Sequence, residues 1–255
     1  MESDEFEMIS HMQDQDQDPE LSCEDETPET LETLETPETP KTPNPPTITK
    51  IYFILDRSSS MERCSQSTIE GFNSFLETQS QKVGGDQALF SLSQFNHKTT
   101  PCYSNLPGTQ VPRLTTETFK PDGSTALYDA IGETIDEIVP QDHETIIIVI
   151  LTDGEENSSR TYNATQIKRL ISTKTELGWE FVFLGANQDA VLVGGQLGID
   201  PRTAMTFTQD GHHTERCFNS LNDLITTHRH TKTDPTAKTA PPRLEFTQEN
   251  RQQCL

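Results

Sequence analysis

Oxygen-bearing side chains cluster at one short turn of the chain, directly after a run of apolar residues. Asp56, Ser58 and Ser60 alternate along this turn, and residues 51–55 before it are all apolar. One carboxylate and two hydroxyls at alternate positions of a turn can point at a common centre. They are hard oxygen donors, the type that Mg²⁺ and Ca²⁺ accept. The spacing therefore predicts a binding site for a divalent cation.

The elements on either side of this turn place it where a ligand can bind. A continuous apolar run such as residues 51–55 predicts a strand buried on both faces, as in parallel sheets. Helical spacing of apolar residues begins near Ser67, so the turn connects a strand to a helix. In open α/β sheets, ligands bind at the carboxyl ends of the strands. We therefore expect the oxygen donors of the turn to face a ligand.

The Asp-x-Ser-x-Ser pattern of Asp56, Ser58 and Ser60 resembles the first segment of the metal-ion-dependent adhesion site of the von Willebrand factor A-like family. A serine-rich loop is the simpler interpretation of this pattern alone, because Ser and Thr are frequent throughout the chain. Two further segments of the sequence therefore decide between the two interpretations.

The second segment precedes a predicted helix. Gly123 and Thr125 match the Gly-Gly-Thr of the family, and Ser124 replaces its middle glycine. Because the substitution leaves Thr125 in place, the resemblance still implies a ligand role for its hydroxyl. The alternative is an ordinary helix cap, which favours Ser or Thr at this position in any case.

The third segment follows another predicted buried strand, the apolar residues 146–151. Thr152, Asp153 and Gly154 match the family's Thr-Asp-Gly fully. Glu155 and Glu156 come next, and we expect them to form a solvated loop that influences partner choice, the alternative being a role in orienting water. The three segments occur in the order of the family, and the resemblance covers residues 48–228.

The resemblance implies a metal site and a mode of binding. The implied ligands are two carboxylates and three hydroxyls, from Asp56, Ser58, Ser60, Thr125 and Asp153. Mg²⁺ or Mn²⁺ suits this set, whereas Ca²⁺ fits less well because it prefers more oxygens and more carboxylates. Neutral hydroxyls leave the cation attractive to an Asp or Glu of a protein partner. The expected function is therefore metal-dependent protein binding, without catalysis.

The rest of the sequence predicts a doubly wound α/β fold with helices on both faces of a mostly parallel sheet. The resemblance, which is to a Rossmann-like fold, also implies one antiparallel strand at an edge. The expected strands are residues 47–55, 88–95, 98–103, 145–152, 179–186 and 203–208. The expected helices carry the apolar stripes Ile69, Phe72, Phe75 and Leu76; Leu127, Ile131, Ile135 and Ile138; Ile167, Leu170 and Ile171; and Phe218, Leu221, Leu224 and Ile225, with a shorter helix over residues 189–197.

Composition divides the 255 residues into one domain and two tails. Residues 1–47 carry 15 of the 41 acids and one lysine, and they contain few large apolar side chains. Such a segment cannot bury enough surface to fold, so it predicts a disordered acidic tail. We interpret it as solubilising; the alternative is that its carboxylates block the metal site. Residues 229–255 are polar and proline-containing, and they predict a flexible tail with a short ordered segment near Leu244–Phe246.

Charge and cysteine content restrict the partners and the compartment. The net charge is −22, which disfavours nucleic-acid binding. The five cysteines are odd in number and widely spaced, which is typical of a reducing compartment. The sequence also lacks the pattern of a signal peptide and any apolar run of membrane-spanning length. We therefore expect an intracellular, cytoplasmic protein that does not bind membranes.

Three other functions are compatible with parts of the sequence. A metal-dependent or nucleotide-binding enzyme is disfavoured, because the glycine cluster at residues 194–198 lacks the dinucleotide-binding spacing and follows no strand. A metal-free structural scaffold would leave the three segments without a role. A zinc site is disfavoured because its candidate ligands do not have the usual spacing; they are His212, His213, Cys217, His228 and His230.

Overall fold

The computed structural model describes residues 48–81, 83, 86–233 and 243–255. The acidic segment 1–47 lies outside the described residues, so its disorder and its proposed action on the metal site stay predictions. Within the described residues, no helix is both long enough and apolar enough to cross a membrane. Cys64, Cys102, Cys217 and Cys254 are all free thiols.

A six-stranded sheet forms the centre of the fold, in the order β3-β2-β1-β4-β5-β6. All neighbouring pairs are parallel except β2 and β3, so the predicted mostly parallel sheet with one antiparallel edge strand is confirmed. The strands are β1 (Ile48–Asp56), β2 (Gln87–Phe95), β3 (Thr99–Pro107), β4 (Glu144–Thr152), β5 (Glu180–Ala186) and β6 (Ala204–Phe207).

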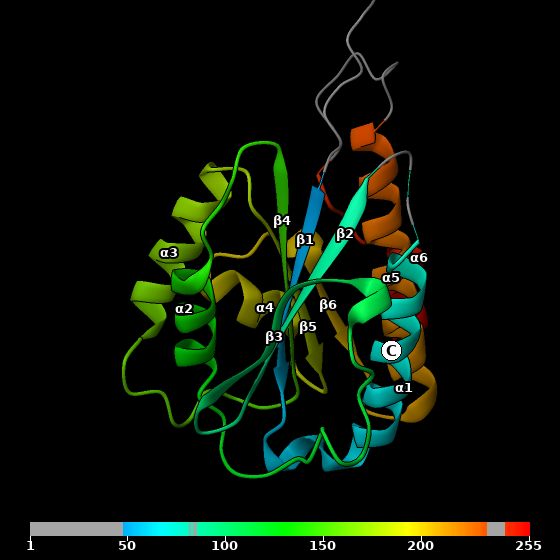
Figure 1. Ribbon diagram of the computed structural model, residues 1–255. Coiled ribbons are helices and arrows are strands. Elements are labelled where there is room, and N and C mark those ends of the chain that lie inside the picture. The colour runs from blue at the N-terminus through cyan, green and yellow to red at the C-terminus, as the bar shows by residue number, and fades with distance from the viewer. Residues whose placement is uncertain (1–47, 82, 84–85, 234–242) are drawn as a thin grey trace, which may run out of the picture. The chain divides into compact units, whose positions relative to one another are not determined.

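Helices cover both faces of this sheet, as Figure 1 shows with α2 and α3 on one side and α1 and α5 on the other. The helices are α1 (Ser65–Gln79), α2 (Leu127–Glu137), α3 (Ala164–Glu176), α4 (Ala190–Gln196), α5 (Gly211–Thr233) and α6 (Gln248–Gln253). One apolar core lies between the sheet and α1, α5 and α6, and a second lies between the sheet and α2, α3 and α4. Because β1 and β4 are central, both of their faces are buried.

The predicted helix stripes become the contacts between helices and sheet. Phe72 and Phe75 of α1 pack edge-on against Phe53 of β1, with ring centroids 5.0 and 5.3 Å apart. On the other face, Ile131 and Ile135 of α2 are 0 and 1% exposed. Burying an aliphatic or aromatic side chain of this size stabilises the fold by about 1.5–3 kcal/mol. These contacts fix both helices against the strands whose ends carry the predicted metal ligands.

The edge strand β3 is longer than the sequence predicts. The expected strand ended at residue 103, whereas β3 continues to Pro107. Its pairing with β2 contains two register irregularities, one between Phe90 and Leu92 and one between Leu92 and Ser93. Asn105 has a φ of 53°, in the left-handed region that non-glycine residues rarely adopt. These irregularities accommodate the extra residues and turn their side chains relative to the sheet.

The predicted boundary of the domain at residue 228 is wrong for the described residues. Helix α5 continues to Thr233, and Arg229 is only 1% exposed. Its guanidinium Nε lies 2.6 Å from Oδ2 of Asp86, and its Nη1 donates to the backbone oxygen of Gln79 at 2.8 Å. The helix therefore uses a charged residue in its last turns to pack against the end of α1, which an apolar stripe does not predict.

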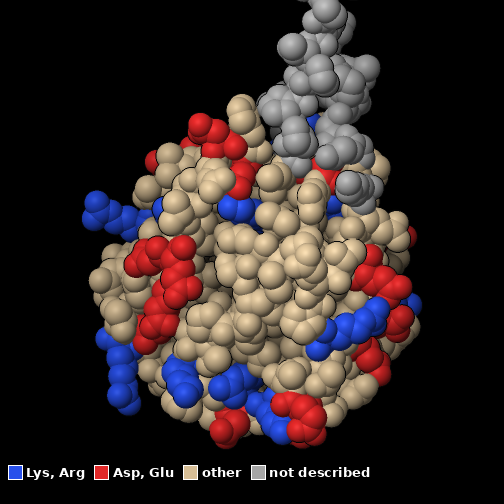
Figure 2. All heavy atoms as spheres, in the orientation of Figure 1, with Lys and Arg blue, Asp and Glu red and all other residues tan. Residues whose placement is uncertain are grey.

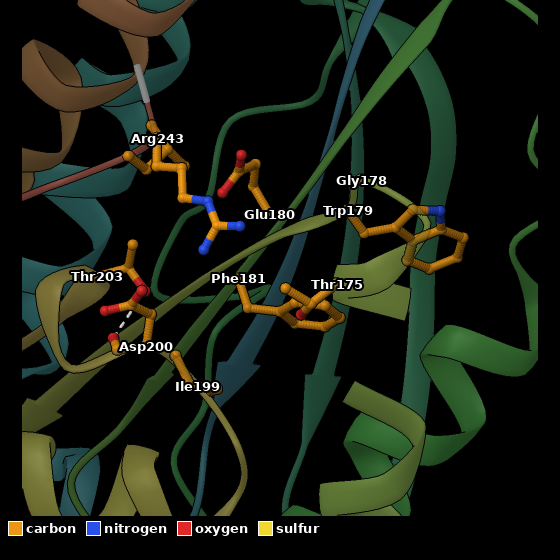
Figure 3. Close-up of a pocket in the computed structure, with 10 residues that line it drawn as sticks. Thr175, Gly178, Trp179, Glu180, Phe181, Ile199, Asp200, Thr203 and Arg243 are labelled. Carbon is orange, nitrogen blue, oxygen red and sulfur yellow. Dashed lines mark hydrogen bonds between the residues drawn. The ribbon is translucent and has the colours of Figure 1, made fainter. Parts of the chain in front are cut away.

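The described C-terminal residues also pack on the domain instead of forming a flexible tail. Leu244, Phe246 and Cys254 are 2, 2 and 0% exposed and belong to the same apolar core as α1 and α5. Figure 3 shows where this segment returns to the sheet, with Arg243 reaching toward Glu180 over a pocket of about 140 Å³. The short ordered segment predicted near residues 244–246 is present, and it is part of the core.

Candidate metal centre

Three loops meet at the carboxyl end of the central strands, and they carry the predicted metal ligands. β1 and β4 are parallel neighbours in which Leu55 pairs with Leu151, so both strands end at the same level. The first loop follows β1, the second precedes α2 and the third follows β4. In Figure 1 the loops lie at the end of the sheet toward which the β1 arrow points.

Asp56 is held rigidly at the end of β1. The residue is 0% exposed. Its Oδ1 accepts a hydrogen bond from the backbone N–H of Ser58 at 2.6 Å, and its Oδ2 accepts one from Oγ1 of Thr152 at 2.6 Å. The carboxylate is therefore oriented from two different loops before any ligand binds.

A chain of short contacts connects the other predicted ligands. Ser58 Oγ lies 3.1 Å from Ser60 Oγ, and Ser60 Oγ donates to Oδ1 of Asp153 at 2.6 Å. The Thr125 hydroxyl lies beside Gly154 and close to Ser60. A Cβ atom added to that glycine would lie 2.8 Å from Thr125 Oγ1 and 3.5 Å from Ser60 Oγ. The five predicted ligands are thus brought to one place, and any residue larger than glycine at position 154 would crowd the threonine hydroxyl.

Backbone hydrogen bonds hold the first and second loops together. The N–H of Ser59 donates to the carbonyl oxygen of Gly123 at 3.0 Å, and the N–H of Asp122 donates to that of Arg57 at 2.8 Å. Gly123 has a φ of +81°, which L-amino acids rarely adopt. This is the glycine retained from the family's pair. The position occupied by Ser124 does not share the left-handed conformation.

The third loop is fixed to the second by side chains that the sequence did not point to. Asn157 Oδ1 accepts from the N–H of Thr125 at 2.9 Å, and the N–H of Asn157 donates back to the carbonyl of Thr125 at 3.0 Å. Asp129 of α2, 9% exposed, accepts the backbone N–H groups of Arg160, Thr161 and Tyr162 at 2.8–2.9 Å. Asp129 lies off the apolar stripe of α2, so no sequence pattern marked this second contact.

Glu155 and Glu156, which follow β4, were both expected to be solvated, and only Glu155 is exposed. Glu155 is exposed, as expected of a solvated loop residue. Glu156 instead accepts hydrogen bonds from the backbone N–H of Tyr128, Ser158 and Ser159 and from the hydroxyl of Ser159, at 2.7–3.0 Å. Its carboxylate therefore holds the third loop against the start of α2.

Gln209, between β6 and α5, is a further contact of the site. Its Nε2 donates to Oδ2 of Asp153 at 2.5 Å and to the carbonyl oxygen of Ser60 at 3.0 Å. No sequence pattern marked this residue, because it lies 56 positions beyond Asp153 and belongs to none of the three segments.

Two carboxylates without a basic partner give the site its electrostatic character. Burial raises the pKa of Asp56 to about 6. Hydrogen bonds from Thr152 and Ser58 oppose this rise, and the charge of the nearby Asp153 adds to it. Burial also raises the pKa of Asp153. Neither acid forms a salt bridge within the described residues. The charge of Arg63 acts on Asp153 without forming a salt bridge, and the remaining neighbours are neutral hydroxyl and amide groups, so the donor set fits a hard divalent cation.

The zinc and dinucleotide alternatives do not agree with the structure. Across the described ranges, no group of three His, Cys, Asp or Glu side chains is placed to hold a metal ion. Of the proposed zinc ligands, Cys217 is 0% exposed in the apolar core, and His213 Nδ1 pairs with Asp210 at 2.7 Å. The zinc hypothesis is therefore wrong. The glycine cluster 194–198 lies in α4 and the turn after it, where no strand end leads into a helix.

Comparison with known proteins identifies the domain. Residues 50–226 match the model of the von Willebrand factor type A domain. The chain belongs to the von Willebrand factor type A domain family. Domains of this family are generally interaction modules that lack enzymatic activity. Among proteins with curated descriptions, none matches the chain.

Solved structures of two von Willebrand factor type A proteins resemble this domain. Proximal thread matrix protein 1 from the mussel byssus, in a structure with a zinc-occupied MIDAS motif, aligns with a TM-score of 0.52 and 18% identity, covering 71% of this chain and 46% of that one. The pilus adhesin SpaC from Lactobacillus rhamnosus GG aligns with a TM-score of 0.54 and 12% identity, covering 71% and 30%. At these identities the likeness establishes the fold alone. The chain spans less than half the length of either protein.

Proposed function

We propose that this von Willebrand factor type A domain is a divalent-cation-dependent protein-binding module that does not catalyse a reaction. The observation that carries the proposal is the buried, doubly hydrogen-bonded carboxylate of Asp56, which has Asp153 nearby and no basic partner in the described residues. A buried carboxylate is compensated by a basic partner, by several backbone N–H donors as at Asp129, or by a bound cation; among the described residues Asp56 accepts from one backbone N–H.

The proposed ligands of the cation are the carboxylates and hydroxyls that the three loops bring together: Asp56, Ser58, Ser60, Thr125 and Asp153. We infer that the cation is Mg²⁺ or Mn²⁺, since five side chains with only two charges match an octahedral ion that retains water better than they match Ca²⁺. When bound, the cation would supply a positive centre for an oxygen ligand. The two carboxylates would balance the formal charge of the ion, while three neutral hydroxyls and retained water would leave a coordination position that an oxygen ligand can take.

The proposed partner is a protein that presents an Asp or Glu side chain. A carboxylate oxygen matches the hardness of the cation and would complete its coordination by replacing a water. The chain's own residues contribute by preorganisation, because Thr152, Asn157 and Gly123 fix the three loops through hydrogen bonds within the domain. Preorganised groups lose little entropy when a ligand binds.

The first test is direct titration of the metal-free full-length chain by calorimetry. We expect saturable binding of Mg²⁺ and Mn²⁺ by the wild type and loss of that binding in Asp153→Ala. Zn²⁺ is included because the mussel protein holds zinc in its MIDAS motif. If neither Mg²⁺ nor Mn²⁺ binds, the domain is a metal-free scaffold and the proposal fails.

The second test concerns the partner. Wild type and Asp153→Ala are used for affinity capture in Mg²⁺ and in chelator, and the captured proteins are compared. The expected result is a protein that binds wild type in Mg²⁺ alone, and whose binding is lost when one of its own acidic residues is changed to the amide. Capture that is unaffected by both chelator and Asp153→Ala would contradict a metal-mediated interaction.

A further inference from the structure

A second cavity lies between α2 and the edge of the sheet, away from the metal centre. Its volume is about 270 Å³, and it is bounded by residues of β1, β2, β3, α2 and the segment after α2. Lys50 and Tyr52 line it from the first half of β1, whereas Asp56 ends that strand at the metal centre. Within the described residues, the cavity and the metal centre have no lining residue in common.

The lining of this cavity consists mainly of neutral hydrogen-bonding groups. Tyr52 pairs with Ser91 and Ile54 with Ser93 in the sheet, so both serines share the face of Tyr52 that points toward α2. Opposite them lies Thr134 of α2. Hydroxyl and amide groups come from eight lining residues, which are Tyr52, Ser91, Ser93, Tyr103, Ser104, Asn105, Thr134 and Gln141.

Thr134 is a polar residue that the fold does not satisfy. It lies on the buried face of α2, between Ile131 and Ile138, and is only 6% exposed. Its Oγ1 is buried and has no hydrogen-bond partner among the described residues. Leaving a buried hydroxyl unpaired costs about 1–3 kcal/mol, and most buried side-chain polar atoms in proteins do have partners. The hydroxyl is shielded from solvent, so a ligand in the adjoining cavity would provide the missing partner once the Thr134 side chain turns toward it.

The wall on the side of the edge strand is built by an irregular residue. Asn105 adopts a left-handed φ of 53°. Its N–H donates to Ser91 Oγ at 2.9 Å, and its Oδ1 accepts from Tyr52 Oη at 3.2 Å. Asparagine tolerates this conformation better than most residues, so it suits the irregular pairing of β3 at this point. Both bonds hold lining residues of the cavity in fixed positions.

The charges around the cavity argue against an ionic ligand. Lys50 is the one cationic side chain among the described lining residues, and its Nζ lies 2.7 Å from Glu144, with both side chains less than a tenth exposed. An anion would therefore compete with an ion pair that is already formed. Strand β3 contains no charged residue, and Figure 2 shows a broad uncharged surface in the middle of this view, where β3 lies in Figure 1.

We propose that this cavity binds a neutral polyhydroxylated molecule about the size of a monosaccharide. Hydroxyl groups both donate and accept hydrogen bonds, so they match a lining of serine, threonine, tyrosine and asparagine groups. An apolar ligand would leave Thr134 unsatisfied. An anion would find Lys50 already paired with Glu144, and the lining carboxylate outside that pair, Glu137, is exposed at the surface. Ile138, Val139 and Pro101 give the cavity apolar surface against which a sugar ring can pack.

Ligand-observed saturation-transfer NMR on the full-length chain tests this proposal. The probes are glucose, galactose and mannose at millimolar concentration, with glucose 6-phosphate and glucosamine as charged counterparts. We expect saturation transfer to at least one neutral hexose, no tighter binding of the charged sugars, and no effect of chelator. Transfer to none of the neutral hexoses would overturn the proposal, and so would preference for a charged sugar.

Variants at position 134 locate the binding. Thr134→Val removes the hydroxyl at nearly constant volume, and we expect about a tenfold loss of hexose affinity, the effect of one lost hydrogen bond. Thr134→Ser retains the hydroxyl and should retain binding, as should Thr173→Val on the exposed surface of α3. Urea unfolding verifies that each variant is folded. Wild-type affinity in Thr134→Val would show that the sugar binds elsewhere and overturn the assignment.

Discussion

The acids at the two ends of the central sheet are compensated in opposite ways. At the carboxyl end, Asp56 and Asp153 lie near each other and have no basic partner in the described residues. At the other end, Asp86 is 1% exposed and its Oδ2 lies 2.6 Å from Nε of Arg229. Lys50 and Glu144 form a second buried pair near that end, at the start of β1 and β4.

This difference distinguishes charges that hold the fold together from charges that await a ligand. A buried acid that serves the structure is compensated within the protein, because an isolated buried charge is strongly unfavourable. Arg229 also donates to the backbone oxygens of Gln79 and Gln81, so its guanidinium joins α5 to the end of α1. The acids of the metal centre have hydrogen bonds but no salt bridge within the described residues, and a divalent cation is the compensating charge that we propose for them.

The largest expected effect is on stability, from Arg229→Met. Removing the guanidinium leaves Asp86 buried, with the Thr49 hydroxyl at 3.0 Å as its one remaining side-chain hydrogen-bond partner among the described residues. Breaking a buried ion pair in this way destabilises by about 3–5 kcal/mol. Urea unfolding followed by circular dichroism measures the free energy of unfolding. Arg113→Ala is the control, because the Arg113–Glu77 pair is largely exposed and should contribute little. Equal effects of the two changes would remove the distinction between the two ends.

At the metal centre, neutralising an acid should have the opposite consequence for the fold. Asp56→Asn retains the size of the side chain and can still bond to Ser58 and Thr152, so we expect the metal-free variant to be at least as stable as wild type. Cation affinity should fall by a hundredfold or more, about 3 kcal/mol, because a charged ligand is lost. Thermal unfolding with Mg²⁺ and with chelator measures both quantities. A variant destabilised in chelator would mean that the carboxylate serves the fold.

The sequence predicts the metal end of the sheet well for a physical reason. Its ligands lie in three short segments, and each segment adjoins a buried strand or an apolar helix stripe that the composition already reveals. Parallel strands place their carboxyl ends at one edge, so residues 56, 125 and 153 can be expected to meet although they are far apart in the chain.

The opposite end could not be predicted in this way. Arg229 follows the last apolar stripe, and its partner Asp86 lies 143 positions earlier. A lone charged residue in a polar stretch is most often solvated, so the sequence favoured a flexible tail from residue 229. The same limit applies to Gln209, whose contact with Asp153 depends on how α5 packs. Long-range pairs of polar residues carry no periodic signal.

The Lys50–Glu144 pair allows the comparison to be sharpened by a double substitution. Lys50→Met leaves Glu144 buried without its partner, and we expect a loss of about 2 kcal/mol in unfolding free energy, less than at Arg229 because the pair retains some exposure. Adding Glu144→Leu should recover most of that loss, since replacing both charges of a buried pair is often neutral. Chemical unfolding of the three proteins tests this. Failure of the double variant to recover would indicate that the pair is needed for more than mutual compensation.

The smallest expected effect separates orientation from charge at the metal centre. Thr152 is 0% exposed and donates its Oγ1 hydrogen bond to Oδ2 of Asp56 at 2.6 Å, while its own side chain is not among the proposed cation ligands. Thr152→Val removes that bond at constant shape, so Asp56 keeps its charge and loses one of its two positioning contacts. We expect cation affinity to fall about tenfold, corresponding to roughly 1.4 kcal/mol, by calorimetric titration.

Thr152→Ser retains the hydroxyl and should bind the cation as wild type does, which distinguishes the hydrogen bond from packing. If Thr152→Val bound as tightly as wild type, the bond from Ser58 alone would suffice to orient Asp56. If it lost binding as completely as Asp56→Asn, the threonine would have to be counted with the cation's own ligands. The intermediate result is expected because the acids of this end are preorganised by neutral donors, whereas those of the opposite end are held by opposite charge.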